Sequence, residues 1–316
     1  MQHSDIEVNR YRNEDKDIWN AFITKSKNSI FLFDRNYMDY HSDRFDDHSL
    51  IILRKGSIVA LFPANQFEKK IISHQGLTYG GILLLQESTL VEVIEMMKQI
   101  VLYYKAMSFH SIIYKCIPYI YHKIPSSEDL YALSLLQASF VRRNASAVID
   151  LNHKIAYAKG RKSQISKARK FDLRIEKSED FNGFMNLVGD RLREKYDAKS
   201  THTENEISYL ASIFPDNIKL YLCKKNDEIH SGIIIFETET TAHCQYISTS
   251  SFGRDIGALD LLTDYLITNI YSSKLYFNFG TSAEFNEIGI NLGLHKNKES
   301  YGARTIICDT YEIGLC

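Results

Sequence analysis

The sequence predicts a mixed α/β protein made of two similar halves. Its 316 residues exceed one typical domain and suffice for two of about 150 residues each. Hydrophobic residues make up 44% and charged residues 24%, which is an ordinary globular balance. One order of predicted elements also occurs twice along the chain. We place the halves at residues 1–150 and 151–316; a single large mixed sheet is the alternative.

The first half opens with a strand and two short helices, predicted at residues 6–11, 17–25 and 36–44. A three-strand meander follows, because Lys55-Gly56-Ser57 joins two apolar runs and favours a hairpin. Thr89 and Glu92 form a capping box ahead of apolar residues at helical spacing, which predicts a long amphipathic helix. The closing elements are a strand at 110–117, a helix at 127–137 and a strand ending at residue 151.

The second half repeats this order. A strand at 173–178 precedes two helices, at 180–196 and 204–214. A hairpin turning at Asn226-Asp227 and a third strand at 241–250 form the meander. The long amphipathic helix is predicted from six apolar positions, namely Ala258, Leu259, Leu262, Tyr265, Leu266 and Ile270. The closing strands are predicted at 274–280 and 303–313.

Charge and composition exclude several classes of protein. The formal net charge of −1 does not suggest the broad basic face that binds duplex nucleic acid. No run approaches the roughly 20 apolar residues that span a bilayer, and the N-terminus lacks a signal-peptide pattern. Five cysteines are scattered without zinc-ligand spacing, at Cys116, Cys223, Cys244, Cys308 and Cys316. We therefore expect a cytoplasmic protein with reduced thiols, no membrane span and no metal.

Four segments carry a resemblance to a known family. They read FLFDRNYMDYHSDRFDDHSL, SHQGLTYGG, PYIYHKIPSSEDLYAL and FNFGTSAEFNEIGINLGLHKNKESYGAR. Together with the repeated element order, they resemble the tandem GNAT-like, FemAB-related N-acyltransferases, often encoded with surface-polysaccharide genes. The last segment is the most specific, and the likeness covers nearly the whole chain. This chain departs from the family pattern at two places. Position 278 is Asn where an Asp is usual, and Arg254–Leu259 keeps only the Arg and one Gly of the family's pyrophosphate loop.

The resemblance implies transfer of an acyl group from acetyl-CoA or another acyl-CoA to an amine. The acceptor would be an amino sugar or a cell-envelope precursor, either a small molecule, a sugar nucleotide or a lipid-linked compound. Two alternatives remain open. An aminoacyl-tRNA donor is suggested by Lys154–Lys177, which holds nine Lys or Arg against two acidic residues, although a solvated helical face also explains this run. The other is a non-enzymatic binding module that has lost its chemistry.

The predicted donor anchor lies at the start of the second long helix. Ser250, Arg254, Gly257 and Ala258 follow a strand and open that helix, so backbone N–H groups and the helix dipole would face a phosphate. The Arg254 guanidinium would add a bidentate contact. An ordinary helix start with an exposed arginine explains the same residues.

Candidate acceptor and base residues occur in both halves. In the first half, His41, Asp43 and Arg44 are candidates for acceptor binding, although a charged helix end is the simpler explanation. His74, a candidate base, stands with Thr78 and Tyr79 among three glycines that suggest close backbone approach to a ligand or a tight turn.

In the second half, the resemblance places His202, Glu204 and Gln245 near a cleft. Polar residues of the last segment also lie close to strand ends, where open α/β sheets bind ligands. These are Asn278, Ser282, Glu284, Asn291, Lys298, Glu299 and Arg304. Glu284 and Glu204 are the candidate bases here, while an amide at position 278 cannot act as one. Lys298 and Glu299 are alternatively a solvated ion pair.

Overall fold

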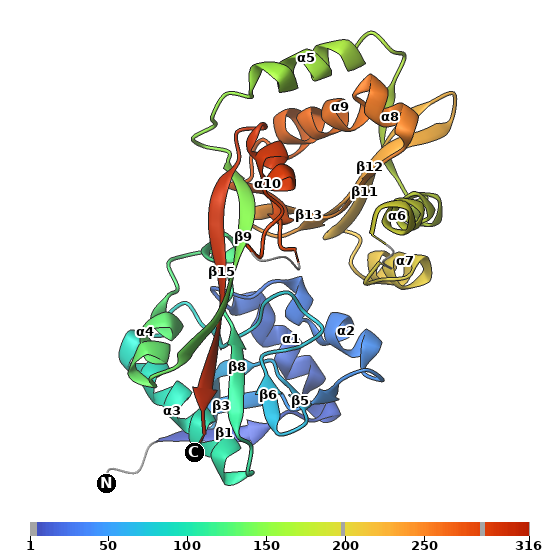
Figure 1. The fold of residues 1–316 in the computed structure, drawn as a ribbon. Helices are drawn as coiled ribbons and strands as arrows, with labels where there is room; N and C mark the ends of the chain where they lie inside the picture. Colours follow the sequence, from blue (N-terminus) through green and yellow to red (C-terminus); the bar gives the residue numbers. More distant parts are fainter. Residues whose placement is uncertain (1–4, 197–199, 285–287, 316) are drawn as a thin grey trace. The chain divides into compact units, whose positions relative to one another are not determined.

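The computed structural model describes residues 5–196, 200–284 and 288–315, which fold into two compact units (Figure 1). Unit 1 comprises Met1–Asn144 and Ile307–Cys316, and unit 2 comprises Ala145–Ile306. The chain therefore returns to unit 1 at its C-terminal end. Both units combine helices with mixed sheets, as the sequence predicts.

Unit 1 contains two sheets. The first has the order β1-β3-β4-β7, and the strands of the second that belong to this unit run β15-β8-β6-β5-β2. Their bounds are β1 Ile6–Arg10, β2 Asp46–Asp47, β3 Leu50–Arg54, β4 Ser57–Phe62, β5 Asn65–Phe67, β6 Lys70–Ile72, β7 Leu83–Leu84, β8 Ser111–Lys115 and β15 Arg304–Gly314. The helices are α1 Lys16–Lys25, α2 Arg35–Met38, α3 Leu90–Ala106 and α4 Glu128–Leu135.

Helix α3 forms the centre of the unit 1 core. The predicted capping box is present, since the Thr89 backbone N–H donates to Glu92 Oε2 at 2.9 Å. The apolar side of α3, including Met96 and Tyr104, packs on buried strand residues such as Ile52 and Phe62. Capping and apolar spacing act within a few residues, so the sequence alone predicts this helix well.

Unit 2 holds a sheet of order β10-β11-β12-β13-β14-β9. The strands are β9 Ser139–Asp150, β10 Arg174–Ser178, β11 Ile218–Lys225, β12 Glu228–Glu237, β13 Thr241–Thr249 and β14 Tyr276–Thr281. The helices are α5 Lys159–Ala168, α6 Phe181–Tyr196, α7 Glu204–Ile213, α8 Ser251–Ile256, α9 Ala258–Tyr265 and α10 Leu292–Glu299. Helix α9 packs on Ile233 and Ile235 of β12, whereas Phe184 of α6 lies against Gly232, one residue before Ile233, so the two helices cover opposite faces.

The start of the second long helix differs from the prediction. Ser250 caps a separate short helix, α8, because its Oγ accepts the Gly253 N–H at 2.9 Å. Gly257 then adopts a left-handed φ of +79° that ends α8, and α9 starts one residue later. A single π-helical turn at Leu266–Ile270 completes the segment. The six predicted apolar positions thus all lie in one continuous helical segment, Ala258–Ile270, and a separate short helix precedes it.

Within the described residues, four cysteines are free thiols: Cys116, Cys223, Cys244 and Cys308. No helix in these parts of the chain is both long and apolar enough to cross a bilayer. Nor do three or more His, Cys, Asp or Glu side chains of the described residues gather in a way that would hold a metal ion.

Candidate functional site

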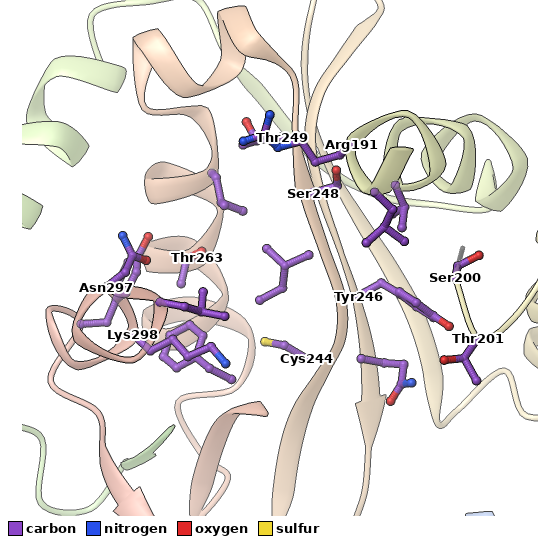
Figure 2. Close-up of a pocket in the computed structure, with 18 residues that line it drawn as sticks. Arg191, Ser200, Thr201, Cys244, Tyr246, Ser248, Thr249, Thr263, Asn297 and Lys298 are labelled. Atoms are coloured by element: carbon purple, nitrogen blue, oxygen red, sulfur yellow. The ribbon is translucent and has the colours of Figure 1, made fainter. Parts of the chain in front are cut away.

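The candidate site lies where two parallel strands of unit 2 separate. Strands β13 and β14 pair over only three residues, from Thr241 opposite Tyr276 to His243 opposite Asn278. Beyond this point β13 continues to Thr249, whereas β14 bends toward β9 through a register irregularity between Asn278 and Thr281. A cavity of about 540 Å³ opens along the unpaired part of β13, lined also by α6, α9 and α10 (Figure 2).

A β-bulge in β13 lets this cavity reach both faces of the sheet. Ile235 of β12 lies opposite Cys244, and Ile234 lies opposite Tyr246, so Gln245 is the extra residue. An extra residue reverses which face the following side chains occupy. Cys244 and Lys298 accordingly lie on one side of β13 and Tyr246 on the other, toward Ser200 and Thr201 (Figure 2).

Lys298 provides a buried amine on the first side. Its side chain is 7% exposed, and its Nζ donates to the carbonyl oxygens of Gly280 at 3.0 Å and Thr281 at 2.7 Å. Burial lowers the pKa of Lys298 to about 8, so the ammonium form still predominates at pH 7. Helix α10 holds this residue in place, and Asn291 caps that helix by accepting the Leu294 N–H at 2.8 Å.

Tyr246 and His202 form a hydrogen-bonded pair on the second side. His202 lies just before α7 and is 5% exposed. Its Nδ1 is 2.6 Å from the Tyr246 phenol oxygen, to which its backbone N–H also donates at 3.1 Å. Burial raises the pKa of Tyr246, so the phenol is neutral at pH 7. The cavity thus has a cationic amine on one side of β13 and a neutral phenol on the other.

Helix α5 supports one wall of the cavity. Its Arg161 pairs with Asp260 of α9 and lies 4.0 Å from the ring centre of Tyr301, a lining residue. The same guanidinium donates to the Tyr301 hydroxyl at 3.0 Å. Lys167 also acts internally, because its Nζ donates to the Asp255 carbonyl at 2.6 Å. Two residues of the basic run Lys154–Lys177 therefore hold α5 against the rest of unit 2.

Unit 1 contains a matching strand pair whose gap is filled. Strands β6 and β8 are parallel over three residues, from Lys70 opposite Ser111 to Ile72 opposite Ile113. The chain after β6 then folds back beside β8. Ser73 Oγ accepts the Lys115 N–H at 2.8 Å, and the Gly80 N–H donates to the Lys115 carbonyl at 2.9 Å. We call residues 73–81 the plug, because they occupy the position that is a cavity in unit 2.

Three solved structures superpose on nearly the whole chain. FemX superposes with a TM-score of 0.65 at 12% identity, covering 98% of this chain and 97% of that one. L-PGS from Bacillus licheniformis gives 0.61 at 14%, covering 96% and 91%. A tandem GNAT protein from the clavulanic acid biosynthesis pathway gives 0.51 at 8%, covering 98% and 99%. No protein-family model and no curated protein matches the chain.

The chain has the tandem GNAT fold of FemX and its structural neighbours. The predicted fold class, a mixed α/β protein with two tandem GNAT-like halves, is thereby confirmed. At these identities the likeness concerns the fold alone. The assignment of chemistry to residues must come from the cavity itself.

In unit 2, the backbone N–H groups of the predicted donor anchor already have hydrogen-bond partners within the protein. The Gly253 and Arg254 N–H groups already bond to Ser250, through its Oγ and its carbonyl. A Cβ at Gly257 would lie 3.0 Å from the Gln164 carbonyl of α5. The Arg254 side chain is exposed, and it does not line the cavity. Ser250 and Ala258 directly adjoin the lining residues Thr249 and Leu259.

Of the other second-half candidates, Gln245 and Lys298 line the cavity. Asn278 shapes the bend of β14, since its Oδ1 accepts the Gly280 N–H at 2.8 Å. Ser282 is buried against His295, with 3.2 Å between Ser282 Oγ and His295 Nδ1. The remaining candidates lie outside the lining: exposed Glu204 and Arg304, half-buried Glu299, and exposed Glu284, which accepts from Asn291 at 3.1 Å.

The first-half candidates separate into buried and exposed groups. His41 and His74 are buried with ring centres 5.8 Å apart, and burial lowers the pKa of His74 well below its ordinary value. Tyr79 is buried against Tyr121, with ring centres 4.8 Å apart. The others are exposed, namely Asp43, Arg44 and Thr78.

The glycines of the plug have packing roles. A Cβ at Gly80 would lie 2.0 Å from the Ser73 carbonyl oxygen. Gly81 has a φ of +106°, and its Cβ would lie 2.6 Å from the Tyr114 hydroxyl. Of the two explanations offered by the sequence, tight folding of the backbone accounts for both positions.

Sequence reasoning missed most of the lining residues. They include Arg191, Ser200, Thr201, Cys244, Tyr246, Ser248, Thr249, Thr263, Asn297 and Tyr301. One signal was present, because the last residues of β13, from Gln245 to Thr249, are unusually polar for a strand inside a sheet. No local pattern marks the others, which come from separate elements.

Proposed function

We propose that this protein is an N-acyltransferase whose reaction takes place in the unit 2 cavity. The observation that carries the proposal is the separation of β13 from β14 around a buried ammonium group. Acyl transfer to an amine requires a held acyl group, stabilisation of the carbonyl oxygen as it gains charge, and removal of a proton. The cavity offers groups suited to each task.

The donor we propose is acetyl-CoA or another acyl-CoA. Residues 244–249 of β13 pair with β12 on one side and have no partner strand in β14 on the other. Their backbone N–H and C=O groups can therefore pair with the amides of an extended carrier arm, as a strand edge pairs with a peptide. The acceptor is the amine of an amino sugar or a related cell-envelope precursor, and it enters from the Tyr246 side.

Lys298 is the residue we assign to the carbonyl oxygen. When the amine nitrogen bonds to the carbonyl carbon, an electron pair moves onto that oxygen, and a buried ammonium stabilises it. The pair then returns as the bond from carbon to the leaving sulfur breaks. Preorganised donors of this kind typically contribute about 10²–10³ in kcat.

Aminoacyl-tRNA is the second donor, favoured by two observations. The backbone N–H groups of Gly253 and Arg254, expected to face a phosphate, already bond to Ser250. Four lysines in or beside α5 are exposed, namely Lys154, Lys159, Lys162 and Lys170. Phosphate contacts by such lysines make binding strongly salt-dependent.

The test is a thermal-shift titration with acetyl-CoA, longer acyl-CoAs and aminoacyl-tRNA, paired with an assay for amide formation on amino-sugar acceptors. A ligand that binds only the folded state raises the melting temperature. We expect a concentration-dependent rise with an acyl-CoA, and at least a 100-fold fall in kcat for Lys298→Met. Lys296→Met is the matched control, because Lys296 is exposed on the same helix, α10, and does not line the cavity.

Each other outcome is informative. Salt-sensitive binding of aminoacyl-tRNA without any response to acyl-CoA supports the second donor. Absence of binding and turnover with either donor contradicts the transferase and leaves a binding module. If Lys298→Met unfolds, Lys298→Arg keeps the positive charge and separates loss of structure from loss of chemistry.

A further inference from the structure

The proposed reaction requires a group that takes a proton from the attacking amine, and none of the three predicted bases is among the residues that line the cavity. Glu204 and Glu284 are exposed and do not line the cavity, and His74 belongs to unit 1. An amide at Asn278 cannot accept the proton. Burial lowers the pKa of His243 to about 4, so this imidazole is a weak base. The proton acceptor has to come from other residues of the cavity.

Tyr246 is placed where such a group is needed. The bulge at Gln245 turns Tyr246 away from Lys298 and toward the α6 face of the sheet (Figure 2). The next side chain on this face, Ser248, donates to the Leu187 carbonyl of α6 at 3.2 Å, which confirms the orientation. The phenol therefore faces the α6 side of the cavity, which is the side from which the proposed acceptor amine enters.

The hydrogen bonds of Tyr246 decide which way its proton points. A backbone N–H can only donate, so the His202 N–H at 3.1 Å occupies a lone pair of the phenol oxygen. The side chains of Gln245 and Thr201 also hydrogen-bond to Tyr246 and act to lower its pKa, as groups that donate to a phenol oxygen do. With these groups donating, the phenol hydrogen is directed to His202 Nδ1, which lies 2.6 Å away. This requires the imidazole to carry its proton on Nε2, a tautomer set by the partner of the other nitrogen.

We propose that Tyr246 and His202 form a proton relay for the acyl transfer, with Tyr246 as the catalytic residue and His202 as the positioning residue behind it. This inference rests on the proposed function. As the amine nitrogen bonds to the carbonyl carbon, its proton passes to the Tyr246 oxygen, and the phenol proton passes to His202 Nδ1. The leaving sulfur departs with the electron pair of the broken bond and takes a proton from solvent. His202 later releases its own proton to solvent, so the protons balance.

Charged groups facing the pair are compatible with this transfer. Glu206 of α7 acts on Tyr246 electrostatically, and its carboxylate is fixed by accepting the Thr203 N–H at 2.7 Å. Its negative charge favours a transiently protonated imidazole. Arg191 of α6 lines the same cavity, and the neighbouring β12 residue, Ile234, is apolar. Lys298 lies on the far side of β13, next to Cys244 (Figure 2).

The kinetic test uses Tyr246→Phe and His202→Gln in the full chain. We expect Tyr246→Phe to lower kcat by about 100-fold or more with little change in the KM for the donor, as for loss of a general base. His202→Gln should lower kcat about 10- to 100-fold and remove the acidic limb of the pH profile of kcat. A merely structural role would leave that limb in place. His153→Gln is the control, because His153 is exposed.

The tautomer test does not depend on turnover. Nuclear magnetic resonance of ¹⁵N-histidine-labelled protein reports which ring nitrogen of His202 is protonated, with His202→Gln assigning the signal. At pH 7.5 we expect a proton on Nε2, and a changed Nδ1 signal in Tyr246→Phe. A proton on Nδ1 overturns the relay whether or not the enzyme is active. Unchanged kcat and pH profile in both variants of an active enzyme also overturns it, whereas failure of the wild type to bind or transfer any donor contradicts the proposed function instead.

Discussion

The two units share one strand arrangement and differ in the path that the chain takes after the parallel strand. In unit 1, β6 ends at Ile72, and His74 adopts a left-handed φ of +58° as the chain folds back to form the plug. In unit 2, β13 continues past its last pairing with β14 and carries a bulge at Gln245. The same divergence is thus filled by backbone in one unit and left as a cavity in the other.

This difference explains why a glycine-rich segment can wrongly suggest a ligand-binding site. The glycines of the plug are where the sequence suggests close approach to a ligand, yet their close neighbours are Ser73 and Tyr114 of the protein itself. The cavity of unit 2 is bordered by β13, which contains no glycine between Thr241 and Thr249. Backbone that fills a gap needs glycine, whereas backbone that borders a gap does not.

The largest effect is expected from breaking the plug. Gly80→Ala places a Cβ 2.0 Å from the Ser73 carbonyl oxygen, so the backbone of the plug must change its path. We expect a loss of about 4 kcal/mol or more in the free energy of unfolding, or insoluble protein. Gly160→Ala is the control, because its Cβ would meet nothing within 4 Å on the exposed helix α5, and this variant should gain up to about 1 kcal/mol. Equal stability of the two variants in urea denaturation would contradict the packing role that we assign to Gly80 in the plug.

The next effect concerns the wall of the cavity. Arg161→Ala removes the ion-pair partner of Asp260 and leaves the hydrogen bond from the Tyr301 hydroxyl, and both side chains of the ion pair are largely buried, at 11% and 14% exposed. We expect a loss of about 3 kcal/mol in unfolding free energy, together with a raised donor KM as Tyr301 loses its support. Lys162→Ala, one residue away on the exposed face of α5, should cost less than about 0.5 kcal/mol. Similar costs for the two would mean that α5 does not support the wall.

A smaller effect is expected in the pH dependence of stability, through a buried carboxyl group of unit 1. Burial raises the pKa of Asp129 in unit 1 to about 6, above its value in the unfolded chain. The folded protein then binds more protons than the unfolded protein above pH 4, so stability falls as pH rises through 6. Between pH 5 and 7.5 we expect the wild type to lose about 1 kcal/mol relative to Asp129→Asn. A constant difference across that range in guanidinium melts would contradict the shift.

The smallest effect is expected at Arg254. Its side chain is exposed on α8, so an ion pair with a donor phosphate would be weakened by solvent. We expect Arg254→Ala to weaken acyl-CoA binding about three- to fivefold, with partial recovery in Arg254→Lys, as measured by calorimetry. An unchanged affinity would remove this residue from the donor site and leave the β13 edge as the main anchor.

Local patterns in the sequence sufficed for the elements themselves and for the fold class. Three features depend on residues close together in the chain: the capping box at Thr89, the hairpin at Lys55-Gly56-Ser57 and the apolar spacing of α3. They can therefore be recognised in the sequence without knowledge of tertiary contacts. Gln245 and Lys298 were also singled out as site candidates, through a resemblance that holds over the whole fold.

Only the tertiary structure decided where the cavity opens and what surrounds it. The bulge at Gln245 exists because β12 and β13 pair in a particular register, and the gap exists because β14 turns toward β9, a strand more than 120 residues earlier in the chain. The internal bonding at Ser250 and the plug beside Lys115 likewise depend on distant partners. Such pairings are set by long-range strand register, which no local window of residues contains.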